Sequence, residues 1–161
     1  MKVLLVCSAG GHFKAIYQLQ SFWETCDRSW VTFRTSVTEA SLDGEKVDWA
    51  WWPTNRNLPN FLKNLALAWK ILRRDRPDVV ISTGAGVAVP FLAIARLLGI
   101  QTVFVESITR VTDLSLSAKL VLPFTNVLYV HWSQLQLRYP QAELIVPQSV
   151  ISSHQGIATQ N

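Results

Sequence analysis

The sequence predicts an α/β fold, a Rossmann-like parallel sheet with helices on both faces. Three observations indicate it: short apolar runs alternate with helical patterns, glycine turns follow two of these runs, and the first run is apolar at consecutive positions. The chain has 161 residues, of which 49% are hydrophobic and only 16% are charged. This balance fits one domain with a sizeable core and excludes a disordered chain.

The first half of the chain is expected to contain three strands and two helices. Gly10-Gly11 forms the turn after the first strand, and Pro59 opens the second helix, where proline is well accommodated. The expected strands are 2–8, 30–34 and 47–52, and the expected helices are 13–24 and 59–74. Apolar side chains fall on one face of the second helix at steps of three and four: Leu58, Phe61, Leu62, Leu65, Trp69 and Leu72.

The second half continues the alternation. A second glycine turn, Thr83-Gly84-Ala85-Gly86, precedes an apolar helix that Gly99 ends. The expected strands are 78–82, 102–105, 127–130 and 143–146, the expected helices are 87–98 and 132–138, and 107–124 is a loop with a further helix. Ligands of parallel sheets bind beyond the carboxyl ends of the strands. In this chain those ends carry Ser8–His12, Thr83–Gly86, Glu106–Arg110 and His131.

The turn after the first strand carries the first candidate for chemistry, His12. Gly10 and Gly11 allow close approach of the backbone to a ligand, and the helix that follows offers free N–H groups to an anion. An imidazole there can take a proton from a hydroxyl group or contact a phosphate. The alternative is a tight turn with an exposed histidine. A dinucleotide site is excluded, because the G-x-G-x-x-G spacing and the acid after the second strand are both missing. His131 is expected to be structural.

Two further strand ends offer polar groups. Glu106 follows an apolar strand and is desolvated on one side, which suits a general base, although a helix cap or an ion pair with Arg110 is the alternative. Gly84 and Gly86, with Pro90 after them, form a second possible anion or hydroxyl site. Close packing of the helix on the strand explains those glycines equally well.

The second helix and the tryptophans before it suggest a membrane-facing surface. Six cations and one anion fall between residues 56 and 76, next to Trp49-Ala50-Trp51-Trp52. Tryptophan beside lysine and arginine is typical of proteins that dock on an anionic bilayer. The alternative is a solvated helix face with core tryptophans, and no pattern supports binding of nucleic acid. The expected membrane-facing residues are Trp51, Trp52, Lys63, Lys70 and Arg74.

Compartment and interfaces follow from composition. No signal peptide or membrane-spanning run is found, and Cys7 and Cys26 lack metal-ligand spacing, so we expect a cytoplasmic protein without a metal. A mean hydropathy of +0.19 and seven tryptophans predict that apolar surface stays exposed. Residues 122–161 contain only Arg138 and Glu143 as formal charges, which makes this region a candidate interface.

Four segments occur together in one order: V-C-S-A-G-G-H, S-T-G-A-G-V-A-V-P, F-V-E-S-I-T-R and L-Y-V-H-W-S-Q-L-Q-L-R-Y-P. Over about residues 2–147, this set resembles the acceptor-side subunit of split bacterial polysaccharide glycosyltransferases, the PssD type. It is also similar to the membrane-recruiting subunit of the eukaryotic two-part N-acetylglucosaminyltransferase of the dolichol pathway. More distantly it resembles the N-terminal half of MurG, a peptidoglycan glycosyltransferase.

The resemblance implies one half of a GT-B glycosyltransferase divided into two chains. Residues 1–147 would form a Rossmann-like acceptor-binding domain, and 148–161 a short polar tail. A C-terminal-half subunit would complete a heterodimer and bind the UDP-sugar, so this chain would hold no cofactor. The acceptor would be a polyprenyl-diphosphate-linked sugar at the inner face of the plasma membrane, used in exopolysaccharide or capsule synthesis.

By the same resemblance, the transfer would be inverting. Either His12 or Glu106 would be the base, and the sequence does not choose between them. The acceptor or its diphosphate would contact Ser8, Gly10, Gly11, Gly84, Gly86 and Arg110. Two other classes stay open: a non-catalytic scaffold that recruits and activates the partner at the membrane, and a self-sufficient small nucleotide-binding enzyme.

Overall fold

The computed structural model describes residues 1–145. Within them a seven-stranded, fully parallel sheet has the strand order β3-β2-β1-β4-β5-β6-β7, which confirms the predicted fold class. The expected tail at 148–161 and the end of the last expected strand, Val146, lie outside the described residues. The strands are β1 (Lys2–Cys7), β2 (Asp27–Thr32), β3 (Val47–Trp49), β4 (Val79–Gly84), β5 (Gln101–Val105), β6 (Val127–Val130) and β7 (Ala142–Leu144).

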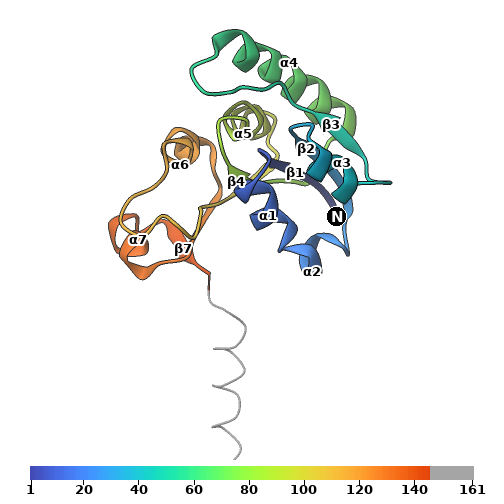
Figure 1. Cartoon of the computed structure of the whole chain (residues 1–161). Coiled ribbons are helices and arrows are strands. Elements are labelled where there is room, and N and C mark those ends of the chain that lie inside the picture. Colours follow the sequence, from blue (N-terminus) through green and yellow to red (C-terminus); the bar gives the residue numbers. More distant parts are fainter. Residues whose placement is uncertain (146–161) are drawn as a thin grey trace, which may run out of the picture.

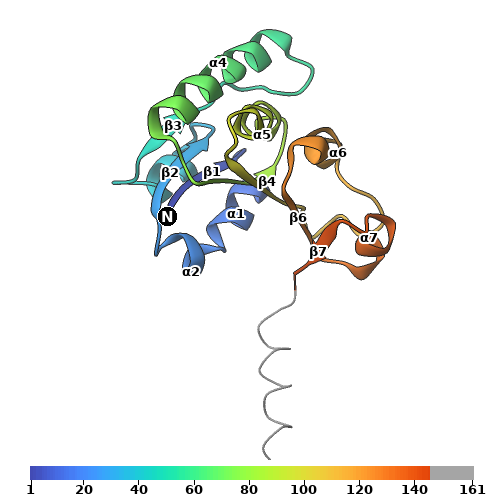
Figure 2. The same ribbon diagram turned by 180° about the vertical axis from the view of Figure 1, so that it is seen from behind.

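Helices cover the two faces of the sheet unequally (Figures 1 and 2). On one face lie α4, α5 and α6, and on the other lie α1 and α2. The helices are α1 (Gly11–Tyr17), α2 (Gln20–Trp23), α3 (Ser36–Ser41), α4 (Leu58–Asp75), α5 (Ala88–Leu97), α6 (Leu116–Val121) and α7 (Ser133–Arg138), with a 3-10 turn at Leu122–Phe124.

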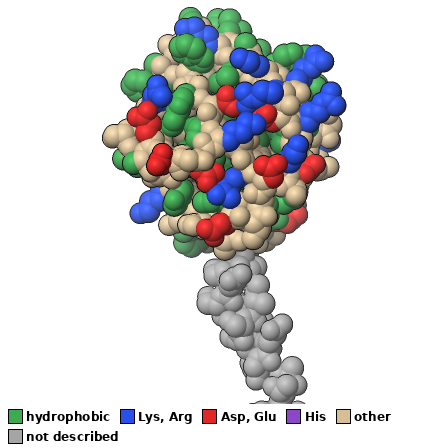
Figure 3. All heavy atoms as spheres, turned by 90° about the vertical axis from the view of Figure 1, so that its right-hand side faces the viewer, with side chains coloured by type: hydrophobic (Ala, Val, Ile, Leu, Met, Phe, Trp, Pro, Cys, Tyr) green, Lys and Arg blue, Asp and Glu red, His purple; other side chains and the backbone are tan. Residues whose placement is uncertain are grey.

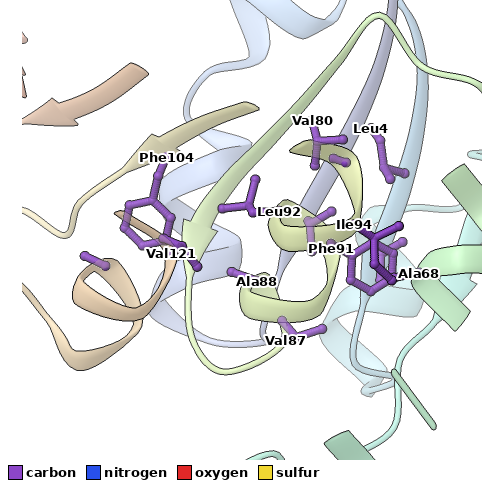
Figure 4. Packing of buried hydrophobic residues seen from close by; sticks show 14 of the residues in the cluster. Leu4, Ala68, Val80, Val87, Ala88, Phe91, Leu92, Ile94, Phe104 and Val121 are labelled. Carbon is purple, nitrogen blue, oxygen red and sulfur yellow. The ribbon is translucent and has the colours of Figure 1, made fainter. Parts of the chain in front are cut away.

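The core is divided into two layers by the sheet. The larger layer lies between the sheet and α4, α5 and α6, where Phe91 and Leu92 of α5 pack between Ala68 of α4 and Phe104 of β5 (Figure 4). The smaller layer lies under α1 and α2 and contains Trp30 with an edge-to-face neighbour, Trp23, at 5.2 Å between ring centroids. These two layers hold the ends of the strands, and therefore the site residues, in fixed positions.

Within residues 1–145, the handedness of the connections leaves half of one sheet face without a helix. The connection from β1 to β2 runs toward one edge of the sheet, whereas those from β3 through β7 run toward the other. Because parallel crossovers are right-handed, opposite directions place their helices on opposite faces. Within residues 1–145, the face that carries α1 and α2 therefore has no crossover helix over β5 to β7. An apolar groove of about 740 Å³ lies there, and its walls include Leu19, Phe22, Ile81, Val103, Val105 and Tyr129.

Three elements differ most from the sequence prediction, and β3 also ends at Trp49 rather than at the expected residue 52. The helix expected at 13–24 is divided into α1 and α2, which are separated at Gln18 and Leu19. The strand expected at 30–34 begins at Asp27, because its polar start pairs with the first residues of β1 at the rim of the sheet. Helix α3 was not predicted; the side chains and main-chain N–H groups of Thr35 and Thr38 form a reciprocal capping box at its start.

The expected apolar face of α4 is only partly buried. Ala68, Ile71 and Leu72 are buried, as is Asn64, but Leu58, Leu62 and Trp69 are 66%, 54% and 47% exposed. The cause is the Asn64 amide, which accepts a hydrogen bond from the Trp51 main-chain N–H (2.8 Å) and donates one to the Trp51 carbonyl (3.0 Å). These two bonds orient the helix with Asn64 toward the sheet, so part of the apolar stripe faces outward.

Candidate functional site

A cleft of about 650 Å³ lies at the carboxyl ends of β4, β5 and β6, beside the start of α1. Its walls include Gly11 and His12 from the first turn, Thr83 from β4, Glu106 and Thr109 after β5, and His131 after β6. The structure thus brings His12, Glu106 and His131 to one cleft, as the sequence predicts for ends of parallel strands. Ser8, Gly10, Gly84, Gly86 and Arg110, also expected at the site, are not among the residues that line this cleft.

His12 is held by two hydrogen bonds to one residue of β4. Its Nδ1 lies 2.7 Å from the main-chain oxygen of Thr83, and the Thr83 hydroxyl donates to the His12 carbonyl oxygen at 2.7 Å. A carbonyl oxygen can only accept, so Nδ1 carries the proton. In the neutral ring, Nε2 is then the nitrogen with a free lone pair, as a general base requires.

Glu106 anchors a loop. Its side chain is 2% exposed, and its two oxygens accept hydrogen bonds from the main-chain N–H groups of Ser107 (2.8 Å) and Ser115 (2.7 Å). Within the described part of the chain, Arg110 is exposed and forms no ion pair with Glu106. The carboxylate therefore closes the loop 107–115 over the end of β5. No sequence pattern indicates the second donor, Ser115, which lies nine residues after Glu106.

His131 is the second imidazole of the cleft. Burial lowers its pKa from the usual value, because the charged form loses hydration, and interactions with the Glu106 main chain and carboxylate offset part of this effect. The net effect favours the neutral form of the ring. A neutral imidazole beside Glu106 can donate or accept a hydrogen bond in the cleft without adding charge.

The four candidate glycines differ in their backbone conformation and in the space around them. Gly10 has φ +76°, and a Cβ at Gly10 or Gly11 would meet no atom within 4 Å. Gly84 has φ +117°, and a Cβ there would lie 3.1 Å from two ring atoms of His12. A Cβ at Gly86 would lie 3.1 Å from the side chain of Thr54. Only the first turn therefore leaves open space for a ligand, while Gly84 and Gly86 accommodate neighbouring side chains.

An exposed apolar surface with cations lies on α4 and the segment before it. Trp51 and Trp52 are 51% and 71% exposed, and the ammonium group of Lys63 lies 4.5 Å from the centre of the Trp51 ring. We call this surface the α4 patch and define it by Trp51, Trp52, Leu58, Leu62, Lys63, Trp69 and Lys70.

Arg74, also expected on the membrane-facing surface, is engaged in ion pairs instead. Its guanidinium contacts Asp48 at 2.6 Å and Asp75 at 2.8 Å. These contacts raise the pKa of Arg74 further above its usual value and lower that of Asp75 to about 2, chiefly through the hydrogen bonds between the two groups. Figure 3 shows one side of the molecule, on which lysine and arginine side chains gather with acidic side chains among them.

Residues 1–145 contain neither a membrane-spanning helix nor a cluster of metal ligands. None of their helices combines the length and apolar character needed to cross a bilayer. In the same residues, no three histidine, cysteine or acidic side chains lie together as ligands of a metal ion would.

The family described as "Oligosaccharide biosynthesis protein Alg14 like" matches residues 54–147. The human UDP-N-acetylglucosamine transferase subunit ALG14 is 36% identical over 87 residues, which are 50% of this chain and 40% of that protein. The Schizosaccharomyces pombe subunit of the same name is 40% identical over 75 residues, 43% of this chain and 35% of that protein. The chain thus matches less than half the length of these relatives. His12 and its turn precede the family match.

Solved structures confirm the fold. Acinetobacter baumannii MurG superposes with a TM-score of 0.66 at 20% identity, covering 84% of this chain and 43% of that one. The UDP-GlcNAc 2-epimerase of Methanocaldococcus jannaschii superposes with a TM-score of 0.72 at 16% identity, covering 100% of this chain and 51% of that one. Each likeness places the sheet and helices of this chain on about half of a larger Rossmann-like protein.

Proposed function

Because the chain belongs to the Alg14-like family of oligosaccharide biosynthesis proteins, we propose that it is the acceptor-binding subunit of a two-component glycosyltransferase. A separate subunit binds the nucleotide sugar, which we propose to be a UDP-sugar such as UDP-GlcNAc. The acceptor is a polyprenyl-diphosphate-linked sugar at the cytoplasmic face of the membrane. The pathway is the synthesis of an exopolysaccharide or capsule repeat unit, as in subunits of the PssD type.

One observation carries this proposal: relatives named as UDP-N-acetylglucosamine transferase subunits align with 50% and 43% of this chain. The cleft is consistent with it, because it lies where parallel α/β sheets bind ligands and contains an oriented imidazole. The sequence offers no dinucleotide fingerprint, so a donor site on a second chain is the simpler arrangement.

In the proposed reaction, a hydroxyl group of the acceptor attacks the anomeric carbon of the donor sugar. The bond from that carbon to the UDP oxygen breaks, UDP leaves with the bonding electrons, and the anomeric configuration is inverted. His12 Nε2 takes the proton of the attacking hydroxyl, since Nδ1 already carries one. Glu106 is the weaker candidate for the base, because both of its oxygens accept main-chain hydrogen bonds.

The α4 patch supports docking at a bilayer surface. Leu58 and Leu62 project outward, and exposed tryptophan side chains lie beside lysine, as in interfacial helices.

Vesicles with anionic lipids should therefore bind the protein. Leu62→Glu should weaken binding about tenfold or more. It removes apolar area that the bilayer would bury, and it adds a negative charge that the anionic lipids repel. Leu137→Glu, at an 83% exposed leucine of α7, is the control and should bind like the parent protein. Equal binding of all three proteins would exclude the α4 patch as the docking surface.

The partner subunit requires a surface of its own. The groove over β5 to β7 is apolar, is not covered by a helix of residues 1–145, and adjoins the charge-poor segment that begins at residue 122. Burial of such a groove is a typical source of association free energy. We propose that the nucleotide-sugar subunit docks here, so that Val103→Asp should abolish pairing while a substitution in the α4 patch should not.

The experiment that tests the function is a transfer assay on the chain purified together with its partner. Vesicles contain a polyprenyl-diphosphate-linked sugar, and the donor is radiolabelled UDP-GlcNAc. We expect transfer by the pair and none by either chain alone, and a loss of about 100-fold or more in His12→Gln. Full activity of His12→Gln in the pair would support the scaffold alternative. Binding of UDP-GlcNAc by this chain alone would support a self-sufficient enzyme.

A further inference from the structure

We infer that Thr83 and Gly84, at the end of β4, form a seat that fixes the ring orientation and tautomer of His12. Thr83 is then a positioning residue for the proposed base, and Gly84 is present to accommodate the imidazole rather than to contact a ligand. This role for both residues rests on the proposed function of His12, but the tautomer itself can be observed without any reaction.

A register shift between β1 and β4 makes Thr83 available to His12. Strand β1 pairs with β4 in regular register up to Val6 and Ser82, but the next pair joins Cys7 to Gly84. Thr83 is therefore the extra residue in β4, and such a residue is left outside the ladder. Its carbonyl oxygen is free to accept from His12 Nδ1 at 2.7 Å.

The contact between the two residues is reciprocal. The Thr83 hydroxyl donates to the main-chain oxygen of His12 at 2.7 Å, while the Thr83 carbonyl accepts from the His12 ring. Thr83 is 2% exposed, so water does not compete easily for these groups. One bond fixes the backbone at the start of α1, and the other fixes the ring. Together they direct Nε2 away from β4.

Gly84 leaves room for the His12 ring because it has no side chain. Its φ of +117° is a conformation that L side chains rarely adopt, and a Cβ there would lie 3.1 Å from both Cε1 and Nδ1 of His12. The same Cβ would lie 3.4 Å from Phe104, an ordinary van der Waals distance, so the tight contacts fall on the imidazole. The Gly84 N–H donates to the Ser82 hydroxyl at 3.1 Å, which holds this turn of the backbone from behind.

The tautomer is tested by NMR of the full chain labelled with 15N at histidine. His12→Gln identifies the His12 signals among the three histidines. At a pH where the ring is neutral, we expect one-bond coupling from a proton to Nδ1 and a free-lone-pair shift for Nε2. A neutral ring protonated at Nε2, or a rapid mixture of both forms, would overturn the inference.

Gly84→Ala should release the ring, and both tautomers should then appear. Gly44→Ala is the matched control, because Gly44 also has a positive φ (+77°) but its Cβ would meet no atom within 4 Å. It introduces an alanine at a positive φ without a contact to the imidazole, and it should keep the parent tautomer. If Gly84→Ala keeps the single tautomer while remaining folded, Gly84 is not part of the seat.

Thr83 is tested with Thr83→Val, which keeps the carbonyl and loses the hydroxyl, and with Thr83→Ser, which keeps both. In the assembled pair, Thr83→Val should lower kcat roughly tenfold with little change in KM, and Thr83→Ser should restore it. Parent kcat in Thr83→Val would exclude the Thr83 hydroxyl as a positioning group and leave only the carbonyl contact, which the tautomer measurement tests. If the tautomer is as expected but His12→Gln is fully active, the seat stands and the assignment of His12 as the base fails.

Discussion

Substitutions of Glu106 distinguish two possible roles of this residue, an anchor of the loop 107–115 and a general base. Glu106 is 2% exposed and accepts hydrogen bonds from the N–H groups of Ser107 and Ser115 at 2.8 and 2.7 Å. Glu106→Ala leaves both donors without this partner. Glu106→Gln keeps one acceptor oxygen and turns an NH2 group toward the other donor, so that one bond is lost.

The expected cost follows from these two bonds. A hydrogen bond to a charged group contributes about 1.5–3 kcal/mol, so Glu106→Ala should lower the free energy of unfolding by about 3–6 kcal/mol. For a chain of this length, each kcal/mol lowers the melting temperature by roughly 2–4 °C, which predicts a fall of about 6–24 °C. Glu106→Gln should lose about half as much.

Urea unfolding followed by tryptophan fluorescence measures the stability of both variants. Hydrogen exchange should show faster exchange of the 107–115 amides in Glu106→Ala. Glu143→Ala, at an exposed residue of β7, is the control and should change stability by less than about 0.5 kcal/mol. The reasoning is refuted if Glu106→Gln unfolds like the parent protein but abolishes transfer in the assembled pair, because that pattern belongs to a base.

Three further predictions concern packing, pH and reactivity. Gly86→Ala should lower stability by about 1–2 kcal/mol through its contact with Thr54, and Thr54→Gly should restore part of it; additive effects would exclude this contact. Neighbouring cationic groups lower the folded-state pKa of Asp75 to about 2. The ionised carboxylate should therefore add about 1–2 kcal/mol to the free energy of unfolding above pH 4, and this contribution is lost as the pH falls toward 2. Acid unfolding of Asp75→Asn should lack this contribution, and an unchanged acid profile would contradict it. Burial raises the pKa of Cys7 to about 12, so a maleimide should label Cys26 in the folded protein and Cys7 only after unfolding. Rapid labelling of both thiols would contradict the buried position of Cys7.

Local signals were sufficient for most of the fold. The consecutive apolar residues of β1 and the proline at the start of α4 fixed these elements to within one residue of their observed limits. The expectation that strand ends would meet placed His12 and Glu106 in one cleft. Such inferences succeed because strand burial, proline geometry and the parallel sheet all act on short segments or on element order.

The remainder depended on contacts between distant residues. Asn64 turns α4 because its amide pairs with the main chain of Trp51, 13 residues earlier, and no helical periodicity contains that information. Gly84 and Gly86 looked alike in sequence, yet one accommodates His12 and the other Thr54. Thr83 was assigned to a glycine turn, and its importance lies in a register shift between two strands. Sequence shows the permissive residue in each case, but only the fold shows what occupies the space.

Composition predicts that apolar surface stays exposed, and the topology of the sheet predicts where it lies. A mean hydropathy of +0.19 predicts that some apolar area stays outside the core but does not say where. The right-handed crossovers determine where this apolar area lies, because connections toward β7 can cover only one face of the sheet. The opposite face of β5 to β7 must then be covered by an element other than those connections. A long apolar groove at that position is therefore a consequence of the strand order, and substitution of Val103 tests whether a partner subunit uses it.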